Sequence, residues 1–493
     1  MRWNRTGFPI GVSLTALVIA MELEGCAAVG PDFKRPVAPA EAGYAMAGEQ
    51  GPSSQHATIG AKVAQDWWGA FHSPELDRAM RQALANNPDI AVADATLLAA
   101  RADLAAARGQ RLPQVDLDAG VERERLNFAT FGFDTSEFPG IQNNPELSIY
   151  SVGASVSYAL DVFGGLRRNQ EAAAARADAQ AHRLDAAYLA LTGQVATQAA
   201  IIAAIRAEIV VVEQVTASDR RNIELVRSAQ RAGGVAEGAR VNAQAQADAD
   251  NALLPPLEQQ LTVARHALAV LVGKAPADYS APDFDLATLP LPADIPVSVP
   301  SDLVRQRPDI LQAEADLHAA TAYIGVQTAK LYPRIDLSAG LTQSALQPEH
   351  IFDWPSTAYT LGAGLSAPVF HGGQLKAQRQ SAQRQADAAA AAYRSTVLHA
   401  FGQVADTLQA LSHDEAELAA EQRTEQSAAA TLRLDTLAYR EGGQGLLPVV
   451  DAQRQVDSAR LRVVQVQARR YLDTIQLFVA TGRGWRGEQV ARR

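Results

Sequence analysis

The chain contains one cysteine, nine histidines and 54 carboxylate side chains that could take part in chemistry. The histidines are scattered, and no pair of Cys or His residues has the spacing of a metal site. The sequence has neither a phosphate-binding loop nor a nucleophile elbow, and GxG patterns such as Gly482–Gly484 lack the strand–helix context of a nucleotide site. Most carboxylates fall in Ala-rich helical sequence, which is typical of a solvated helix face. We therefore expect no catalytic residue, no metal site and no enzyme activity.

Cys26 follows a segment with the features of a secretory signal. Arg2 and Arg5 precede the apolar run 10–21, which is too short to span a bilayer. The sequence LEGC that ends at Cys26 is similar to a bacterial lipobox, in which the cysteine becomes the acylated first residue, although Glu24 stands where a small residue is usual. The alternative is a plain signal peptide followed by an unmodified cysteine. The two alanines after Cys26 lack the aspartate of inner-membrane retention. We therefore expect a covalent lipid (diacylglycerol and N-acyl, such as palmitate) on Cys26, no other cofactor, and an outer-membrane location.

The remaining sequence contains an internal repeat. Residues 87–121 align without a gap with residues 307–341, and 14 of the 35 pairs are identical. Later landmarks recur at a similar offset, such as RAGG at Arg231 and REGG at Arg440. The chain is therefore interpreted as two similar halves of about 200 residues each.

Each half changes from helical sequence to strict alternation of apolar and polar residues. Four strands of about ten residues are predicted near 115–124, 149–160, 335–342 and 359–366, each apolar on one face and small or polar on the other. In the first strand the polar face carries Asp116, Asp118, Glu122 and Glu124. Such a pattern fits either a soluble sheet with one face on a core or the wall of a transmembrane barrel, whose strands need about ten residues to cross a bilayer. With an outer-membrane location we favour the barrel, in which these four acids face the lumen. Beyond the signal, we find no hydrophobic run long enough for a spanning helix.

Four strands are too few to close a membrane barrel, which starts at about eight strands. An open sheet edge inside lipid would leave backbone groups unpaired at several kcal/mol each. The barrel must therefore be shared between chains, with eight strands from two copies or twelve from three.

Long Ala-rich helices follow each predicted hairpin. They end at the glycine pairs Gly233–Gly234 and Gly442–Gly443, which are helix-cap signals, and return helices are predicted at about 236–272 and 447–481.

The net charge of −10 and the lack of a basic cluster exclude a nucleic-acid partner. The predicted layout is a signal peptide 1–25, an acylated linker 26–60 without a core of its own, a first repeat 61–272 (hairpin 113–162, helical pair 166–272), a Pro-rich linker 273–300, a second repeat 301–482 (hairpin 333–370, helical pair 374–482) and a tail 483–493.

An ordered set of segments gives a family resemblance. The segments are GCAAVGPDFKRP, DWWGAFHSPELDRAMRQALANNPDI, YALDVFGGLRR, LVRQRPDI, LYPRIDLSAGL, APVFHGGQL and LLPVVDAQRQV. They resemble the TolC-like outer membrane factors, specifically the NodT-type lipoproteins that serve resistance–nodulation–division (RND) efflux pumps. The resemblance implies a mixed α and β membrane protein that forms a homotrimer. Its twelve-stranded outer-membrane β-barrel, four strands per chain, would continue as a long α-helical periplasmic barrel.

The resemblance also implies a function: a passive exit duct for small molecules (drugs, toxic compounds or metal ions) handed over by an inner-membrane pump and a periplasmic adaptor. The alternatives are an exit channel for type I protein secretion and, in a different class, a soluble periplasmic coiled-coil adaptor or scaffold. Because the predicted lumen carries acids, we also expect a mild preference for cations.

Residue roles follow from the same resemblance. Asp451 matches the position whose carboxylates ring the periplasmic aperture, and Tyr439 matches a tyrosine used in gating contacts. Asn242 occupies the position of Asp451 in the first half, so the aperture is expected to carry three carboxylates per trimer rather than six. The adaptor is expected to contact the helix turns that contain Gly233, Gly234, Gly442 and Gly443. From the residues alone, Asp451 reads as a solvated side chain in the first turn of a helix.

Overall fold

The computed structural model describes residues 28–37, 43–44, 46, 56–61, 63–127 and 145–482. The predicted signal peptide, Cys26 and the tail 483–493 lie outside the described residues. The chain divides into two compact units, which we describe one at a time. The sheet unit comprises Met1–Arg35, Leu98–Asp178 and Ala315–Ala391, and the helical unit comprises Pro36–Leu97, Ala179–Glu314 and Ala392–Arg493.

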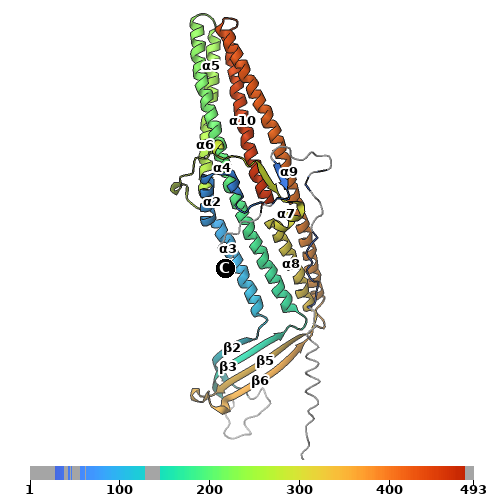
Figure 1. Cartoon of the computed structure of the whole chain (residues 1–493). Helices are drawn as coiled ribbons and strands as arrows, with labels where there is room; N and C mark the ends of the chain where they lie inside the picture. Colours follow the sequence, from blue (N-terminus) through green and yellow to red (C-terminus); the bar gives the residue numbers. More distant parts are fainter. Residues whose placement is uncertain are drawn as a thin grey trace, which may run out of the picture. The chain divides into compact units, whose positions relative to one another are not determined.

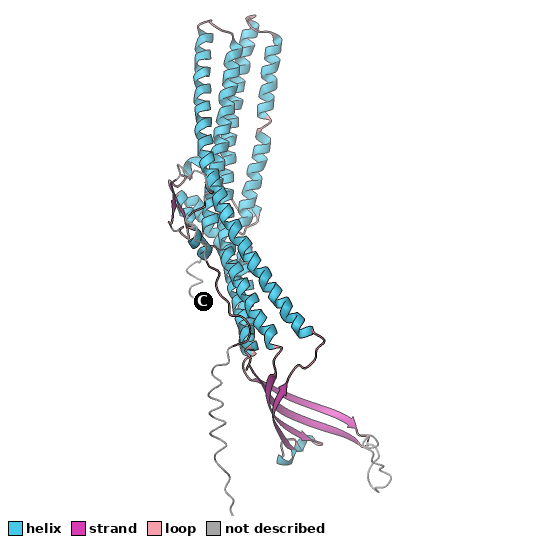
Figure 2. Cartoon of the chain, turned by 90° about the vertical axis from the view of Figure 1, so that its right-hand side faces the viewer, coloured by secondary structure: helices cyan, strands magenta, loops and turns pink. Residues whose placement is uncertain are grey.

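A single antiparallel sheet dominates the sheet unit (Figures 1 and 2). Its strands are β2 (Gln114–Arg125), β3 (Glu146–Leu160), β5 (Arg334–Ala345) and β6 (Thr357–Ser366), in the order β2-β3-β5-β6. Two short 3₁₀ turns, Pro348–His350 and Trp354–Ser356, connect β5 to β6. The two hairpins join through β3 and β5, so β2 and β6 form the edges of the sheet.

The strand register sorts the side chains into polar and apolar rows. One row across the sheet consists of Asp116, Ser155, Gly340 and Thr360, and the adjacent row consists of Val115, Val156, Ala339 and Leu361. The two rows point to opposite faces because side chains alternate along a strand. On the apolar face Leu117 is 82% and Leu361 79% exposed in the single chain. The predicted four amphipathic strands are therefore confirmed.

The helices confirm the internal repeat. Helices α3 (Pro88–Gly109) and α8 (Pro308–Ala329) have 22 residues each, and each leads into a strand that begins after a proline. Helices α4 (Gly165–Arg231) and α9 (Gln374–Arg440) have 67 residues each. At the start of α4 the Asp161 carboxylate accepts hydrogen bonds from the N–H groups of Leu166 (2.9 Å) and Arg167 (2.7 Å), which fixes the helix directly after β3.

The return helices differ between the repeats. The prediction of one continuous helix at 236–272 is wrong: the structure has α5 (Glu237–Asn251) and α6 (Leu254–Leu271). Pro255 and Pro256 follow the break, and proline removes a helical N–H donor and clashes with the preceding turn. In the second repeat α10 (Leu446–Thr481) is continuous, because its proline, Pro448, lies in the first turn, where the N–H has no helical partner.

One stretch of α4 corrects the expectation that no apolar run is long enough to span a membrane. By length and composition alone, α4 contains such a run, and more than half of that run is buried. Its side chains Val195, Ile202, Ala203 and Val212 are almost fully buried in the helical unit. A helix at the core of a folded unit passes the same test, and we interpret α4 in this way.

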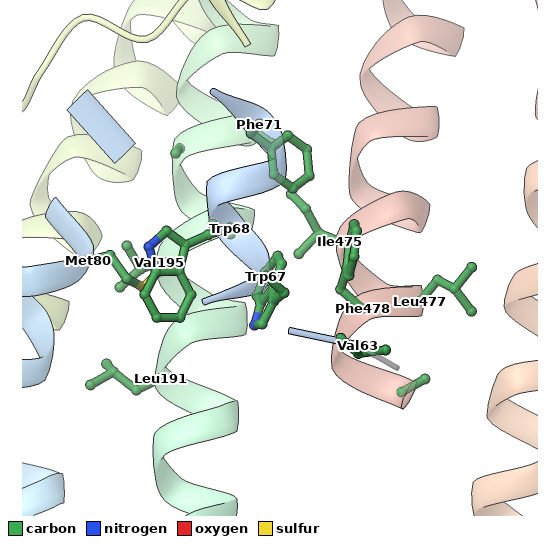
Figure 3. Packing of buried hydrophobic residues seen from close by; sticks show 14 of the residues in the cluster. Val63, Trp67, Trp68, Phe71, Met80, Leu191, Val195, Ile475, Leu477 and Phe478 are labelled. Atoms are coloured by element: carbon green, nitrogen blue, oxygen red, sulfur yellow. The ribbon is translucent and has the colours of Figure 1, made fainter. Parts of the chain in front are cut away.

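The core of the helical unit contains an aromatic cluster (Figure 3). It forms where the 3₁₀ turn η2 (Trp67–Phe71) and α2 (Pro74–Asn86) meet α4 and α10. The Trp67 ring stacks on Phe478 with the ring centroids 5.3 Å apart, and Trp68 and Phe71 meet Trp67 edge-on. Ser73 caps α2, since its hydroxyl accepts the N–H of Leu76 at 3.3 Å.

Parts of both predicted linkers pack into the core of the helical unit, and for linker 26–60 this corrects the expectation of a segment without a core. Strand β1 (His56–Ile59) pairs in parallel with β4 (Asp294–Val297), followed by α7 (Pro300–Gln306). Two 3₁₀ turns, Pro276–Asp278 and Leu286–Thr288, precede β4. The Tyr44 hydroxyl donates to the Ser298 carbonyl at 2.7 Å. These segments therefore wrap the helices rather than only connecting the repeats.

Candidate functional site

The four predicted lumenal acids share one face of β2 in the structure. Asp116 and Asp118 stand opposite Ser155 and Gly153, two small residues on β3. All four carboxylates are exposed, and among the described residues no cation lies within ion-pair distance of any of them. On the second hairpin Asp336 shares this face but pairs with Arg334 at 2.7 Å. The unpaired negative charge of the face therefore comes from the first hairpin.

The polarity of the first hairpin reverses at the end far from the helices. Glu122 and Glu124 stand opposite Ile149 and Leu147, while Arg123 on the other face forms an ion pair with Glu146 at 2.8 Å. A charged pair on the otherwise apolar face is expensive within hydrocarbon. We therefore expect this end of the sheet to lie beyond the apolar band, at the level of the headgroups. The pairing of Arg123 with Glu146 depends on the register of β2 and β3, so the sequence alone did not predict it.

Two equivalent turns close the long helices. Gly233 and Gly442 have positive φ angles of 76° and 74°. The next residue in each turn donates its N–H to a helix carbonyl at 2.8 Å: Gly234 to Ala229, and Gly443 to Ala438. This is the Schellman arrangement, which needs a left-handed residue that glycine supplies without strain. The predicted helix ends are confirmed. Contact of these turns with an adaptor remains a prediction.

The two turns lie at the same end of the helical unit, and apolar residues pack beneath them (Figure 1). Val226 of α4 and Leu446 and Val449 of α10 are buried there, and Tyr439 is half-buried against them. The Gln444 side-chain amide donates to the carbonyl and the carboxylate of Asp435 at 2.8 and 3.0 Å. Tyr439 therefore sits where the two helical pairs meet.

Asp451 and Asn242 are both exposed on their return helices. Asp451 lies in the second turn of α10, with 69% of its side chain exposed, and its nearest cation is Arg454 at 4.0 Å. Within the described part of a single chain, Asp451, Asn242 and Tyr439 do not contact one another. An aperture built from these residues therefore needs several copies of the chain.

Sequence reasoning missed a cluster of buried acids in the helical unit. Asp219 of α4 and Asp457 of α10 are 5% and 6% exposed, and Asp250 of α5 is their neighbour. Burial, together with the charge and hydrogen bond of Asp250, raises the pKa of Asp219 to about 6. Burial also raises the pKa of Asp457. Only one sequence feature could have indicated that Asp219 is buried. It lies on the same helix face as the buried residues Val212 and Val226, where an apolar residue is usual.

A second buried acid lies between α9 and α10. Burial and a hydrogen bond with Asp473 raise the pKa of Asp414 to about 6, although Arg469 lies 3.1 Å away. For both acids the nearby arginine does not fully offset burial and the neighbouring carboxylates, so the net pKa change is upward.

The segment after Cys26 is held against α4 and α8 in the sheet unit. The buried Arg168 guanidinium forms ion pairs with Asp32 (2.6 Å) and Glu171 (2.8 Å) and donates to the backbone carbonyls of residues 28–30. Phe33 stacks on His318 at 4.3 Å, and His318 contacts Glu171 at 3.0 Å. This clasp positions residues 28–33 on the start of α4.

Comparison with known proteins agrees with this geometry. The profile of the outer membrane efflux protein family matches residues 79–274 and 299–483, one match for each repeat. The chain is 32% identical over 452 residues to the pyoverdine export outer membrane protein OpmQ of Pseudomonas putida, covering 90% of this chain and 93% of the relative. It is 30% identical over 479 residues to nodulation protein T of Rhizobium leguminosarum bv. trifolii, covering 96% and 97%.

Among solved structures, the outer-membrane channel OprN superposes with a TM-score of 0.84 at 27% identity, covering 93% of this chain and 99% of OprN. The protein is thus an outer-membrane channel component of an efflux system, and its family is one of channels rather than of enzymes. The chain belongs to the outer membrane efflux protein family and has the fold of the TolC-like trimeric channels.

Proposed function

We propose that three copies of the chain close one twelve-stranded barrel in the outer membrane, continued by a periplasmic barrel of long helices. The observation that carries the proposal is the four-stranded sheet with an exposed apolar face and two open edges, β2 and β6. Within lipid each open edge must pair with another strand, because unpaired backbone groups cost several kcal/mol each. Pairing of β2 in one copy with β6 in the next satisfies both edges.

The trimer would act as a passive exit duct for small molecules. An inner-membrane RND-type pump and a periplasmic membrane-fusion adaptor would supply them, and the adaptor would contact the turns at Gly233–Gly234 and Gly442–Gly443. Relatives named as toluene and solvent efflux pump outer membrane proteins of Pseudomonas putida, both 29% identical, support a small-molecule role. Asp451 would ring the aperture with three carboxylates, Asn242 would leave its own positions neutral, and Tyr439 would hold the helical pairs together.

The test is conductance of the purified protein. We expect it to require detergent, to migrate as a trimer in native mass spectrometry and to form ion-conducting pores in planar lipid bilayers. A protein that stays dispersed without detergent and forms no pore would instead support the soluble scaffold interpretation.

Neutralising the lumenal acids is expected to remove cation preference. In a salt gradient the wild-type reversal potential should show a mild preference for cations, because twelve carboxylates per trimer line the barrel. The variant D116N/D118N/E122Q/E124Q should move the reversal potential towards zero with the conductance retained. As a control, Glu146→Gln removes a carboxylate from the opposite face and should leave selectivity unchanged. Anion preference in the wild-type channel would contradict the lumenal assignment.

We further propose that Cys26 carries the diacylglycerol and N-acyl lipid. The clasp around Arg168 supports this, because it fixes the chain from residue 28 onwards at the junction of β3 and α4. Cells grown with labelled palmitate should incorporate label into the wild-type protein and not into Cys26→Ser. An unlabelled wild-type protein with a mature N-terminus elsewhere would show that the signal is a plain one.

A further inference from the structure

A polar groove runs between α9 and α10 in the helical unit. Its cavity volume is about 850 Å³, which lies in the range of small-molecule sites. The lining residues recur at helical spacing on both helices, so the groove follows one face of each. Small residues on α9, such as Ser427 and Ala428, leave the space that the longer side chains of α10 border.

Three arginines make the groove positively charged. Arg423 comes from α9, and Arg454 and Arg462 come from α10. The side chains of Arg454 and Arg462 are 51% and 55% exposed, so their guanidinium donors reach the groove. In the described part of the chain, no carboxylate lies within ion-pair distance of Arg423.

The carboxylates near the groove neutralise this charge only in part. Asp451 lies 4.0 Å from Arg454, and Glu421 lies 3.8 Å from Arg462. Both distances are at the limit of an ion pair and longer than a charge-assisted hydrogen bond. Arg462 also donates to the Ser458 hydroxyl at 3.3 Å. The groove therefore keeps a net positive charge with unused donors.

The first repeat lacks this charge. At the offset that relates Gly233 to Gly442, the three arginines correspond to Gln214, Ala245 and Leu253. The shared architecture of the two helical pairs therefore does not require arginines at these positions. Their presence is a property of the α9–α10 groove itself.

We propose that this groove binds small polyanionic molecules that carry carboxylate or phosphate groups. Arginine matches both groups because its planar fork donates two parallel hydrogen bonds. The inference rests on the proposed function. If Asp451, the groove residue of α10 nearest to the Gly442–Gly443 turn, lines the aperture, the groove lies on the path of the substrate. The channel would collect anionic substrates at its periplasmic end although its barrel favours cations.

Equilibrium dialysis of labelled citrate against the detergent-solubilised full chain at low salt tests this. We expect saturable binding that weakens as salt rises, with acetate a poor competitor. The variant R423Q/R454Q/R462Q should bind at least tenfold more weakly, and Arg423→Gln alone, which breaks no ion pair, should bind about threefold more weakly. The control variant R379Q/R394Q/R433Q removes the same charge from exposed positions elsewhere on α9 and should bind as the wild type does.

The inference would be overturned if the wild type showed no saturable citrate binding, or if the control variant lost citrate binding as much as the arginine variant. It would also be overturned if the arginine variants dissociated into monomers while citrate did not bind to the wild type. The last would show that the groove contacts a second copy of the chain. Pore formation in bilayers is read independently. Pore formation without citrate binding would contradict only the proposal that the groove binds anions. Citrate binding without pore formation would contradict the proposed exit duct.

Discussion

Leu361→Arg is expected to prevent assembly of the protein in the outer membrane, whereas the same substitution at the adjacent Thr360 should be tolerated. Leu361 lies near the middle of β6, in the apolar row with Val115, and is 79% exposed in the single chain. An arginine on the lipid face near the bilayer midplane costs about 2–4 kcal/mol, and a trimer would carry three of them. Thr360 points to the opposite face, in the row of Asp116.

The pair Leu361→Arg and Thr360→Arg keeps the strand, the depth and the added charge constant and changes only the face. Heat-modifiable trimers in the outer-membrane fraction measure assembly. Thr360→Arg should form trimers and shift the reversal potential towards anions, because a cation is added to the lumen. Assembly of Leu361→Arg together with failure of Thr360→Arg would mean that the polar row, rather than the apolar row, faces lipid.

The strands were predictable from the sequence because each obeys a local rule. Alternation separates Leu117 from Asp116 whatever the partner strand is, and Pro113 and Pro333 mark where the preceding helices end. The pairing of β3 with β5 was not predictable in this way, because it joins residues such as Val156 and Ala339 that are far apart in the sequence.

The missed features all depend on packing between distant segments. The strand pair β1–β4 joins short segments whose sequences carry turn residues rather than a clear period. The ion pair of Arg168 with Asp32 depends on the path of the N-terminal segment. Asp219 was missed for a related reason: in an Ala-rich helix nearly every polar residue reads as solvated, and only the neighbouring helices α5 and α10 decide which are buried.

Asp219→Asn is expected to stabilise the helical unit at neutral pH and to remove part of its pH dependence. The pKa of Asp219 is raised from 3.8 to about 6 in the folded chain. Between these values the folded state binds more protons than the unfolded state, so stability falls as pH rises through this window and stays lower above pH 6. Ionising the buried Asp219 carboxylate therefore lowers the stability of the folded chain above pH 6 by up to about 3 kcal/mol. Asparagine keeps the shape and hydrogen-bonding capacity of the side chain but has no charge to bury.

Hydrogen exchange, converted to opening free energies for α4 and α5 at pH 5 and pH 7.5, measures the effect. In the wild type the opening free energy should fall between these pH values, and in Asp219→Asn it should be higher at pH 7.5 and change less. Asp248→Asn is the matched control, because Asp248 is exposed on the same α5 helix as Asp250. An equal effect of both variants would show that general charge, rather than the buried cluster, sets the pH dependence. If only Asp219→Asn acts, the repulsion between Asp219, Asp250 and Asp457 opposes packing of α4, α5 and α10, so these three helices separate more easily at neutral pH than at pH 5.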